Sequence, residues 1–561
     1  MQRIHKNVMV PFVLVTLIAV GGGTGRLRAE ESATVSQAGS QTSATEESKE
    51  MAKLRQAAKH RQRRIIYNND GADMYGRRIR SVEDFLGFWT EQVLGTQVDS
   101  IFYCTGVTTV YSHDTEIAER YDDLVDAIKD TSEGSAYFRN NMPLLRKAGV
   151  DSLKATIRRA HEAGLEVFWT HRINDTHDSS PECERLLSQW KRKHPEYMLG
   201  VPEDTKKYPS SSTKYWWSAL DFEQPEVRDY LYRITEEVGR RYDVDGIEID
   251  YWRYPVFFRP NMDGQPATSS QLDILTEFQR SIRQMAVREG AKRGRPILIA
   301  ARVPMSVDAC RNVGIDIERW LKEDLLDVMS LGNGEAWPNI PAGAIMELGH
   351  EYDVPVYPCI KYSGYGINHL RTWRAAAANA WRAGADGVYF FNIAPYNFRD
   401  PDEFTPQFKE LGDPAKLMAL DKWFSATAPY AGKRYSGYCP MAEVLPSSMA
   451  LPATLSADGQ PTVVNLQIGD DIAAEAARNL VRVRLIPSTL DLLDAVETRL
   501  NGKLLTAKEK DGSGGWTFFS PKSSWYRVGE NEFSFRMVDG SEVESSPVQV
   551  VAVDVLVRYK D

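Results

Sequence analysis

The sequence predicts an α/β protein: a (β/α)8 TIM barrel followed by a small C-terminal β-sandwich domain. Short apolar runs alternate with helical patterns, and after about Gly432 the hydrophobic pattern changes to period two. Strands that alternate with helices imply a parallel sheet. Eight such units fit a closed barrel with enlarged loops. The eight runs are Arg64–Asn68, Ser100–Cys104, Glu166–His171, Gly246–Tyr251, Ile297–Arg302, Asp327–Leu331, Val356–Ile360 and Gly387–Asn392.

The segments between these runs carry helix signals. In one of them Leu153, Ile157 and Ala160 recur at helical spacing, Asp151 occupies an N-cap position and Gly164 marks the end. A doubly wound open sheet is the alternative. It is disfavoured because no glycine-rich phosphate-binding fingerprint follows the first run.

The C-terminal part is typical of β-strands joined by tight turns. Runs such as Val481–Leu485 and Trp516–Phe519 alternate apolar and polar residues. Asn501-Gly502, Asp511-Gly512 and Asp539-Gly540 are turn signals between such runs. The predicted division is a signal peptide at 1–29, a disordered linker at 30–60, the barrel domain at 61–430 and the sandwich at 431–561.

The N-terminus predicts export to the periplasm or the cell exterior. Basic residues precede an apolar run from Val8 to Val20, and Ala29 is the expected cleavage point. No other long apolar run exists, so we expect no stable membrane span after signal cleavage. The net charge of −9 on 561 residues, with acids and bases interspersed, excludes a basic nucleic-acid footprint.

Cysteine and histidine patterns predict no metal and no cofactor. The five cysteines lack metal-ligand spacing, and their odd number leaves at least one unpaired in an exported chain. His171, Asp175, His177 and Asp178 match no strong ligand motif. Neither a disulfide nor an oligomeric state can be assigned from the sequence.

The run Gly246–Tyr251 carries the most informative pattern. Strand side chains alternate between faces, so Ile247 and Ile249 point one way and Glu248 and Asp250 the other. Two acids on one face of a buried strand are costly unless they are paired or used. Paired carboxylates are the groups that glycoside hydrolysis requires.

Three carboxylates are the predicted catalytic residues. Asp250 is the nucleophile or base, because it is the last inward residue of its strand, and Glu335 is the general acid. Glu248 lies one pleat deeper and would orient Asp250 or raise its pKa. In the alternative interpretation Asp250 and Glu248 are structural and bond to Arg253 or Arg302.

Polar side chains also gather where the other apolar runs end. Active sites of (β/α)8 enzymes lie at the C-terminal ends of the strands. The predicted substrate-binding residues there are Asn69, Asp70, His171, Arg172, Asp175, Arg253, Arg302, Asn333, Lys361 and Asn392. Trp217, Trp252 and Tyr254 are added as aromatic contacts for sugars, although the two tryptophans could equally cover the barrel mouth.

The stretch Tyr242–Pro255, together with Ala219–Phe222 and Pro225–Tyr230, resembles the bacterial glycosyl-hydrolase-like family 10 group. These are exported TIM-barrel proteins. The resemblance implies a glycoside hydrolase acting on a polysaccharide or complex glycan, with Asp250 at the acidic position of the motif. Family members often carry His or Asn-like residues where Glu248 stands. The alternatives are a non-catalytic carbohydrate-binding barrel and a metal-dependent carbohydrate-active enzyme.

Overall fold

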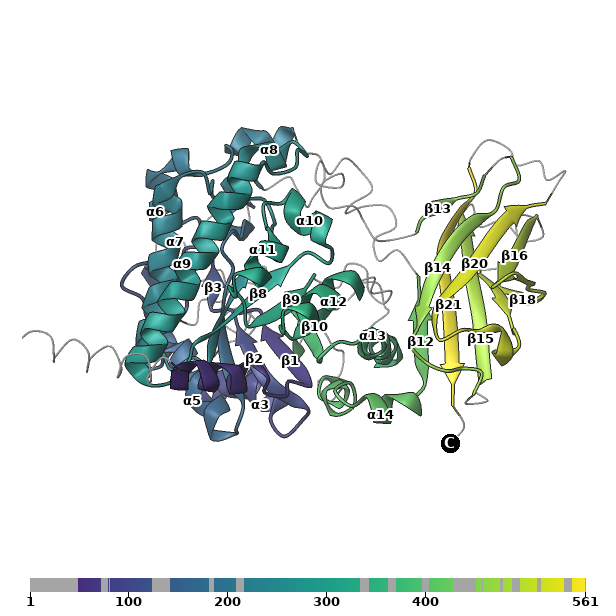
Figure 1. The fold of residues 1–561 in the computed structure, drawn as a ribbon, viewed down its shortest axis with the longest axis horizontal. Helices are drawn as coiled ribbons and strands as arrows, with labels where there is room; N and C mark the ends of the chain where they lie inside the picture. The colour runs from purple at the N-terminus through teal and green to yellow at the C-terminus, as the bar shows by residue number, and fades with distance from the viewer. Residues whose placement is uncertain are drawn as a thin grey trace, which may run out of the picture. The chain divides into compact units, whose positions relative to one another are not determined.

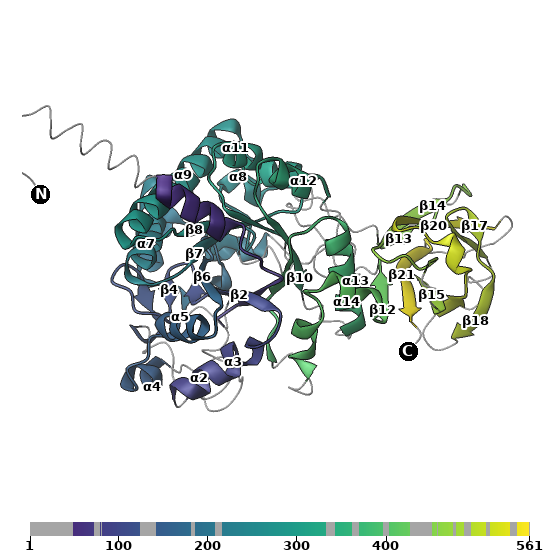
Figure 2. The same cartoon turned by 60° about the horizontal axis from the view of Figure 1, so that its bottom comes forward.

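Eight parallel strands close into a barrel in the order β1-β11-β10-β9-β8-β7-β6-β2 (Figures 1 and 2). The strands are β1 Ile65–Asn69, β2 Val98–Tyr103, β6 Glu166–His171, β7 Gly246–Asp250, β8 Leu298–Val303, β9 Val328–Leu331, β10 Val356–Lys361 and β11 Val388–Phe391. Each overlaps one of the eight predicted runs, so the predicted barrel is confirmed.

This computed structural model describes residues 49–71, 79, 81–123, 142–180, 186–207, 216–332, 343–361, 370–395, 403–426, 451–456, 458–474, 478–486, 495–511, 516–538 and 547–559. Among these residues no helix is long and apolar enough to cross a bilayer. The predicted signal peptide lies outside them, so export remains a prediction. Of the five cysteines, Cys104, Cys310 and Cys359 are described, and each is a buried free thiol.

Helices surround the barrel and connect its strands (Figure 2). Asp151 accepts a hydrogen bond from Lys154 N, which confirms the predicted N-cap of α5. The helices are α2 Val82–Phe88, α3 Thr90–Val93, α4 Met142–Lys147, α5 Ser152–Glu162, α6 Gln189–Lys193, α7 Pro225–Arg241, α8 Arg259–Met262, α9 Ser269–Arg293, α10 Val307–Asn312, α11 Ile317–Lys322, α12 Gly343–Glu351, α13 Leu370–Arg382 and α14 Pro414–Met418.

Short elements fill the connections. They are the strands β3 Gly106–Val107, β4 Val110–Tyr111 and β5 Glu119–Arg120 and the 3-10 helices η4 His177–Ser179, η6 Pro195–Tyr197, η7 Pro202–Lys206, η8 Trp216–Ser218 and η11 Pro406–Lys409. Within the predicted linker, residues 51–59 are helical. The helix is fixed because Arg55 pairs with Asp327 at 2.7 Å and with Asp324 at 2.5 Å.

Alternate residues of each strand fill the barrel interior. Phe102 and Phe168 stack there with ring centroids 4.3 Å apart, and Tyr389 meets Phe102 edge-on at 5.5 Å. At the amino ends of the strands, Arg63 pairs with Glu166 at 2.8 Å and Ser100 donates to the same carboxylate at 2.6 Å. The interior is therefore a packed core, with room for chemistry only at its ends.

The C-terminal region forms two antiparallel sheets, as predicted. One has the order β12-β21-β15-β19-β18 with β13 beside β21, and the other β14-β20-β16-β17. Their strands are β12 Lys422–Ser425, β13 Ala453–Thr454, β14 Thr462–Ile468, β15 Arg478–Ile486, β16 Val496–Leu500, β17 Lys503–Leu504, β18 Ala507–Asp511, β19 Trp516–Phe519, β20 Gly529–Met537 and β21 Gln549–Arg558, with the 3-10 helix η12 Ser523–Trp525. Because β12 pairs with β21, this sheet already includes residues before 431.

Two histidines are buried between the barrel strands and the outer layer. His171 Nδ1 lies 3.0 Å from Thr235 Oγ1, and His113 Nδ1 lies 2.7 Å from Thr105 Oγ1. Burial lowers the pKa of His171 to about 3 and that of His113 to about 4. Both rings are therefore neutral in the folded protein at neutral pH.

These histidines predict a loss of stability in mild acid. Below pH 6.5 the unfolded chain binds protons at both positions and the folded chain does not, so stability is full above pH 6.5 and falls toward pH 4. In this range each histidine lowers the free energy of unfolding by about 1.4 kcal/mol for each pH unit of acidification. Urea unfolding at a series of pH values between 7 and 4.5 gives the free energy of unfolding at each pH. In His171→Gln this free energy should fall less steeply with decreasing pH than in the wild type. An unchanged slope would contradict the assignment.

Candidate active site

The carboxyl end of β7 places Asp250 beside Arg302 of β8. The two residues are register partners in neighbouring strands. Asp250 Oδ2 accepts from Arg302 Nη2 at 2.7 Å, and Oδ1 accepts from the backbone N–H groups of Trp252 at 3.1 Å and Arg253 at 2.9 Å. Asp250 is only 1% exposed. Arg302 is one of the two arginines that the alternative, structural interpretation paired with Asp250. The Asp250 carboxylate also orders the loop that follows.

Arg302 is held as a buried cation. Its Nη1 donates to Gly332 O at 3.0 Å, and its guanidinium carbon lies 3.9 Å from the centroid of the Phe391 ring. Burial alone would lower the pKa of Arg302, but the charge of Asp250 raises it above the ordinary value. Arg302 therefore remains charged and supplies a fixed positive charge next to Asp250.

Glu248 lies one pleat below Asp250, fully buried, as the alternation predicted. Thr170 and Tyr389 each donate to its Oε2 at 2.9 Å, whereas Oε1 has no hydrogen-bond partner among the described residues. Burial, with the negative charge of Asp250, raises the pKa of Glu248 to about 7. At neutral pH Glu248 therefore carries a proton for much of the time.

A second polar group stands on the loop after β6. Arg172 Nη1 donates to Asp175 at 3.0 Å, and Nη2 pairs with the Asp70 carboxylate and donates to Asp70 O at 3.0 Å. Burial opposes ionisation of Asp175, but His177, Arg172 and Arg253 together hold its pKa well below the ordinary value. Asp70 was predicted at one strand end and Arg172 and Asp175 at another, and the three do meet.

His177 joins this group to Arg253. Its Nδ1 lies 2.6 Å from Asp175 Oδ1, and its Nε2 lies 3.1 Å from Arg253 Nη2. Arginine has only donors, so Nε2 must accept and Nδ1 must carry the proton. From the sequence, His177 was considered as a metal ligand and, in preference, as a hydrogen-bond partner of the substrate, but not as a partner of Arg253. The two-residue spacing between Asp175 and His177 was the sequence signal for the contact between those two residues.

Several predicted substrate contacts do not reach the site. His171 faces Thr235 of α7, because residues of β6 alternate and Thr170 is the inward one. Trp217 and Trp252 are 5% and 7% exposed, so neither offers an open ring face to a sugar. Asn69 is buried and accepts from Gly71 N at 3.0 Å. Its neighbour Asn68 accepts from Asn392 N at 3.3 Å.

Of the remaining predicted residues, the structure describes the side chains of Tyr254 and Asn392 but not those of Asn333, Glu335 and Lys361. Tyr254 and Asn392 are partly exposed at the carboxyl ends of their strands, and both have left-handed backbone, with φ of 61° and 51°. Such values are uncommon for residues with side chains and recur at functional sites. Asn333 and Glu335 lie outside the described residues, and only the backbone of Lys361 is described.

The described residues contain no group of three or more His, Cys, Asp or Glu side chains placed to hold a metal ion. Asp178, one of the acids considered for such a site, instead accepts from Lys191 and Ser218, each at 2.6 Å. Its pKa is raised, because burial outweighs the attraction of Lys191. Asp178 is therefore a structural residue of the loop.

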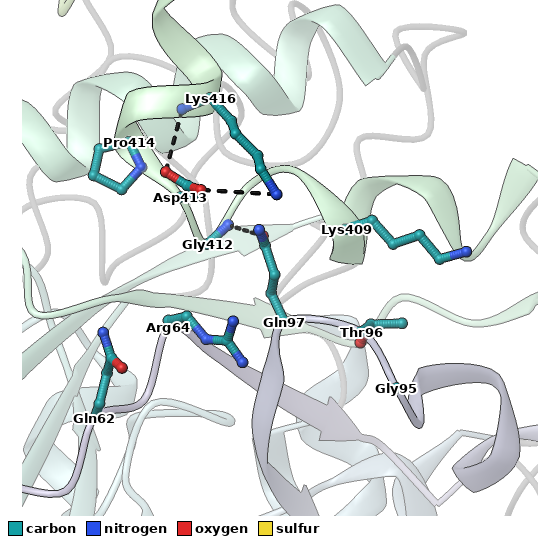
Figure 3. Close-up of a pocket in the computed structure, with 10 residues that line it drawn as sticks. All are labelled: Gln62, Arg64, Gly95, Thr96, Gln97, Lys409, Gly412, Asp413, Pro414 and Lys416. Atoms are coloured by element: carbon teal, nitrogen blue, oxygen red, sulfur yellow. Dashed lines mark hydrogen bonds and ion pairs between the residues drawn. The ribbon is translucent and has the colours of Figure 1, made fainter.

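A hollow of about 570 Å³ lies at the opposite end of the barrel (Figure 3). It is lined by residues that precede β1 and β2, including Arg64 and Gln97, and by Lys409, Asp413 and Lys416. Within this lining Asp413 pairs with Lys416, and Arg64 pairs with Asp99. Active sites of this fold lie at the carboxyl ends, so we place the site at Asp250.

The Asp250–Arg302 pair makes a testable prediction. Arg302→Met should lower the free energy of unfolding by about 3–5 kcal/mol, because it leaves a buried carboxylate without its cation. Arg259→Met is the matched control, since the Arg259 side chain is 51% exposed, and it should change stability by less than about 0.5 kcal/mol. Urea unfolding measures both. Equal stability of the two variants would show that the pair is not a buried charge contact.

Comparison with solved structures gives weak likenesses to glycoside hydrolases. Alpha-L-fucosidase isoenzyme 2 from Paenibacillus thiaminolyticus is 12% identical with a TM-score of 0.39, over 64% of this chain and 50% of the fucosidase. The chain thus spans half the length of that enzyme. The PgaB (BpsB) glycoside hydrolase domain from Bordetella bronchiseptica is 11% identical with a TM-score of 0.37, over 63% of this chain and 98% of that domain.

An alpha-amylase from Geobacillus thermoleovorans, complexed with acarbose, is 12% identical with a TM-score of 0.36, over 84% of this chain and 98% of the amylase. These scores are too low to carry an argument about function. No curated protein matches the chain. Residues 139–271 match the family model described as Glycosyl hydrolase-like 10. This segment contains Asp250, Arg253 and His177, and its match confirms the chain's resemblance to the glycosyl hydrolase-like 10 family.

Proposed function

We propose that this protein is an exported glycoside hydrolase that acts on a polysaccharide or complex glycan, with Asp250 as its essential carboxylate. One observation carries the proposal. Asp250 is held between Arg302 and two backbone N–H groups at the carboxyl end of β7, directly above Glu248. The family match over residues 139–271 supports the same class of reaction.

The electrostatics divide the two acids into different roles. Arg302 and two backbone N–H groups donate to Asp250, whose carboxylate can attack the anomeric carbon or take a proton from water. Glu248 holds a proton near neutral pH, because two close acids in a buried site do not both ionise readily. Above about pH 7 Glu248 loses this proton and places a second negative charge beside Asp250.

The reaction also needs a donor of a proton to the leaving oxygen. Glu335 remains the proposed general acid from the sequence. Glu248 is the competing acid on grounds of its pKa, but it is fully buried beneath Asp250. We assign Glu248 the role of a positioning residue that Thr170 and Tyr389 hold in place.

A second candidate function is non-catalytic carbohydrate binding. One observation favours it: both oxygens of Asp250 already accept hydrogen bonds, and the residue is 1% exposed, as expected of a structural anchor. The metal-dependent alternative required His171 and His177 to converge with an acid. In the structure His171 faces α7 and His177 faces Arg253.

Asp250→Asn should reduce turnover by at least about a thousandfold, as loss of a covalent or base catalyst does. It should lower the melting temperature but leave the protein folded at the assay temperature, because the shape is kept while buried Arg302 loses its anionic partner. Hydrolysis of a polysaccharide panel, with thermal unfolding measured in parallel, tests this. Asp229→Asn, an exposed carboxylate of α7, is the matched control.

Three outcomes would redirect the assignment. Near-normal turnover by Asp250→Asn would move the search to Glu248 and Glu335. Loss of folding would make Asp250 a structural anchor. Binding of glycans by the wild-type protein, with no hydrolysis of any of them, would favour the non-catalytic function.

A further inference from the structure

Arg253 is a charged side chain fixed at the barrel mouth by two separate contacts. Its backbone N–H donates to Asp250 Oδ1, and its guanidinium Nη2 donates to His177 Nε2 at 3.1 Å. The side chain is partly exposed, unlike the buried Arg172 and Arg302. Arg253 therefore reaches toward solvent while its position is set by the proposed catalytic carboxylate.

The carboxylates around Arg253 are engaged elsewhere. Asp70 pairs with Arg172, Asp175 with Arg172 and His177, and Asp250 with Arg302. Among the described residues no carboxylate lies within ion-pair distance of the Arg253 guanidinium, and its buried Nε has no hydrogen-bond partner. Its one hydrogen-bonding side-chain partner among the described residues is His177, which carries no negative charge.

We propose that Arg253 binds an anionic group of the glycan, and that the substrate is therefore an acidic polysaccharide. This inference rests on the proposed function. The anion is a carboxylate of a uronic acid or a sulfate ester, which share the geometry of two oxygens facing two N–H groups. Arginine matches that geometry bidentately, with charge-assisted hydrogen bonds about twice as strong as neutral ones.

The surroundings of Arg253 favour an anion over a sugar hydroxyl. The Tyr254 and Phe391 rings lie 5.5 Å and 5.7 Å from its guanidinium carbon, so they limit its movement and its access to water. The Asp175–His177 pair fixes one Nη, and the other N–H groups of the Arg253 guanidinium make no hydrogen bond to a described residue. A preorganised cation in a partly dry site gains more from a charged acceptor than from a neutral one.

Affinity electrophoresis of the full chain in polysaccharide gels tests the proposal. The panel is polygalacturonate, which carries carboxylates, a carrageenan, which carries sulfate esters, and a neutral galactan. Carboxyl-reduced polygalacturonate and desulfated carrageenan identify which anion is bound. Arg253→Gln is compared with Arg253→Lys, which keeps the charge without the fork. Arg158→Gln, on α5 with a 70% exposed side chain, is the control for loss of one positive charge.

We expect retardation by at least one acidic polymer and not by its neutralised form. Arg253→Gln should weaken it about tenfold or more, a loss of about 1.4 kcal/mol, Arg253→Lys should be intermediate, and Arg158→Gln should match the wild type. Equal affinity for neutral polymers, no retardation by either acidic polymer, or full affinity in Arg253→Gln would overturn the proposal. If Arg253→Gln does not fold, a wild-type affinity of Arg253→Lys also overturns it.

Hydrolysis measured on the same panel separates this inference from the proposed function. Binding of an acidic glycan through Arg253, without hydrolysis by the wild-type chain, would remove the proposed function and leave the anion site. Hydrolysis of a neutral glycan with an unchanged KM in Arg253→Gln would support the proposed function and remove the anion site.

Discussion

The contact between Asp250 and Arg302 is the constraint on which the rest of the site depends. A carboxylate with 1% exposure is stable only if a partner offsets its lost hydration. Arg302 does this from the neighbouring strand, and the Phe391 ring packs against the Arg302 guanidinium. Because the pair sits at the end of β7 and β8, it also fixes which end of the barrel can carry chemistry.

The same carboxylate controls its neighbours in two directions. Downward, its charge adds to the effect of burial and raises the pKa of Glu248 to about 7. Outward, its Oδ1 holds the backbone of Trp252 and Arg253, so the loop after β7 turns into the left-handed Tyr254. Arg253 then meets His177, which Asp175 orients. Asp250 thus affects the protonation of Glu248 in the barrel interior and also fixes the position of Arg253 at the barrel mouth.

The barrel and much of this pairing could be predicted from sequence. Alternation in the run Gly246–Tyr251 placed Glu248 and Asp250 on one face, and a strand-end arginine was expected beside Asp250. His171 was misplaced although the same rule applied to it: Thr170 of that strand points inward, so its neighbour points out. The prediction of Trp217 as a sugar contact failed for another reason, because composition does not distinguish a buried indole from an exposed one. The contact of His177 with Arg253 joins loops after two different strands, which no local pattern encodes.

A crystal structure of the full chain with a bound oligosaccharide tests the central claim most directly. The account predicts a sugar ring at the carboxyl end of β7, with its anomeric carbon within reach of Asp250 Oδ2. The nearest second carboxyl should lie about 5–5.5 Å from Asp250 for retention or about 6.5–9.5 Å for inversion. An oligosaccharide bound only at the hollow beside Arg64 and Lys416, or only on the C-terminal sheets, with Asp250 still enclosed by Arg302, would contradict it.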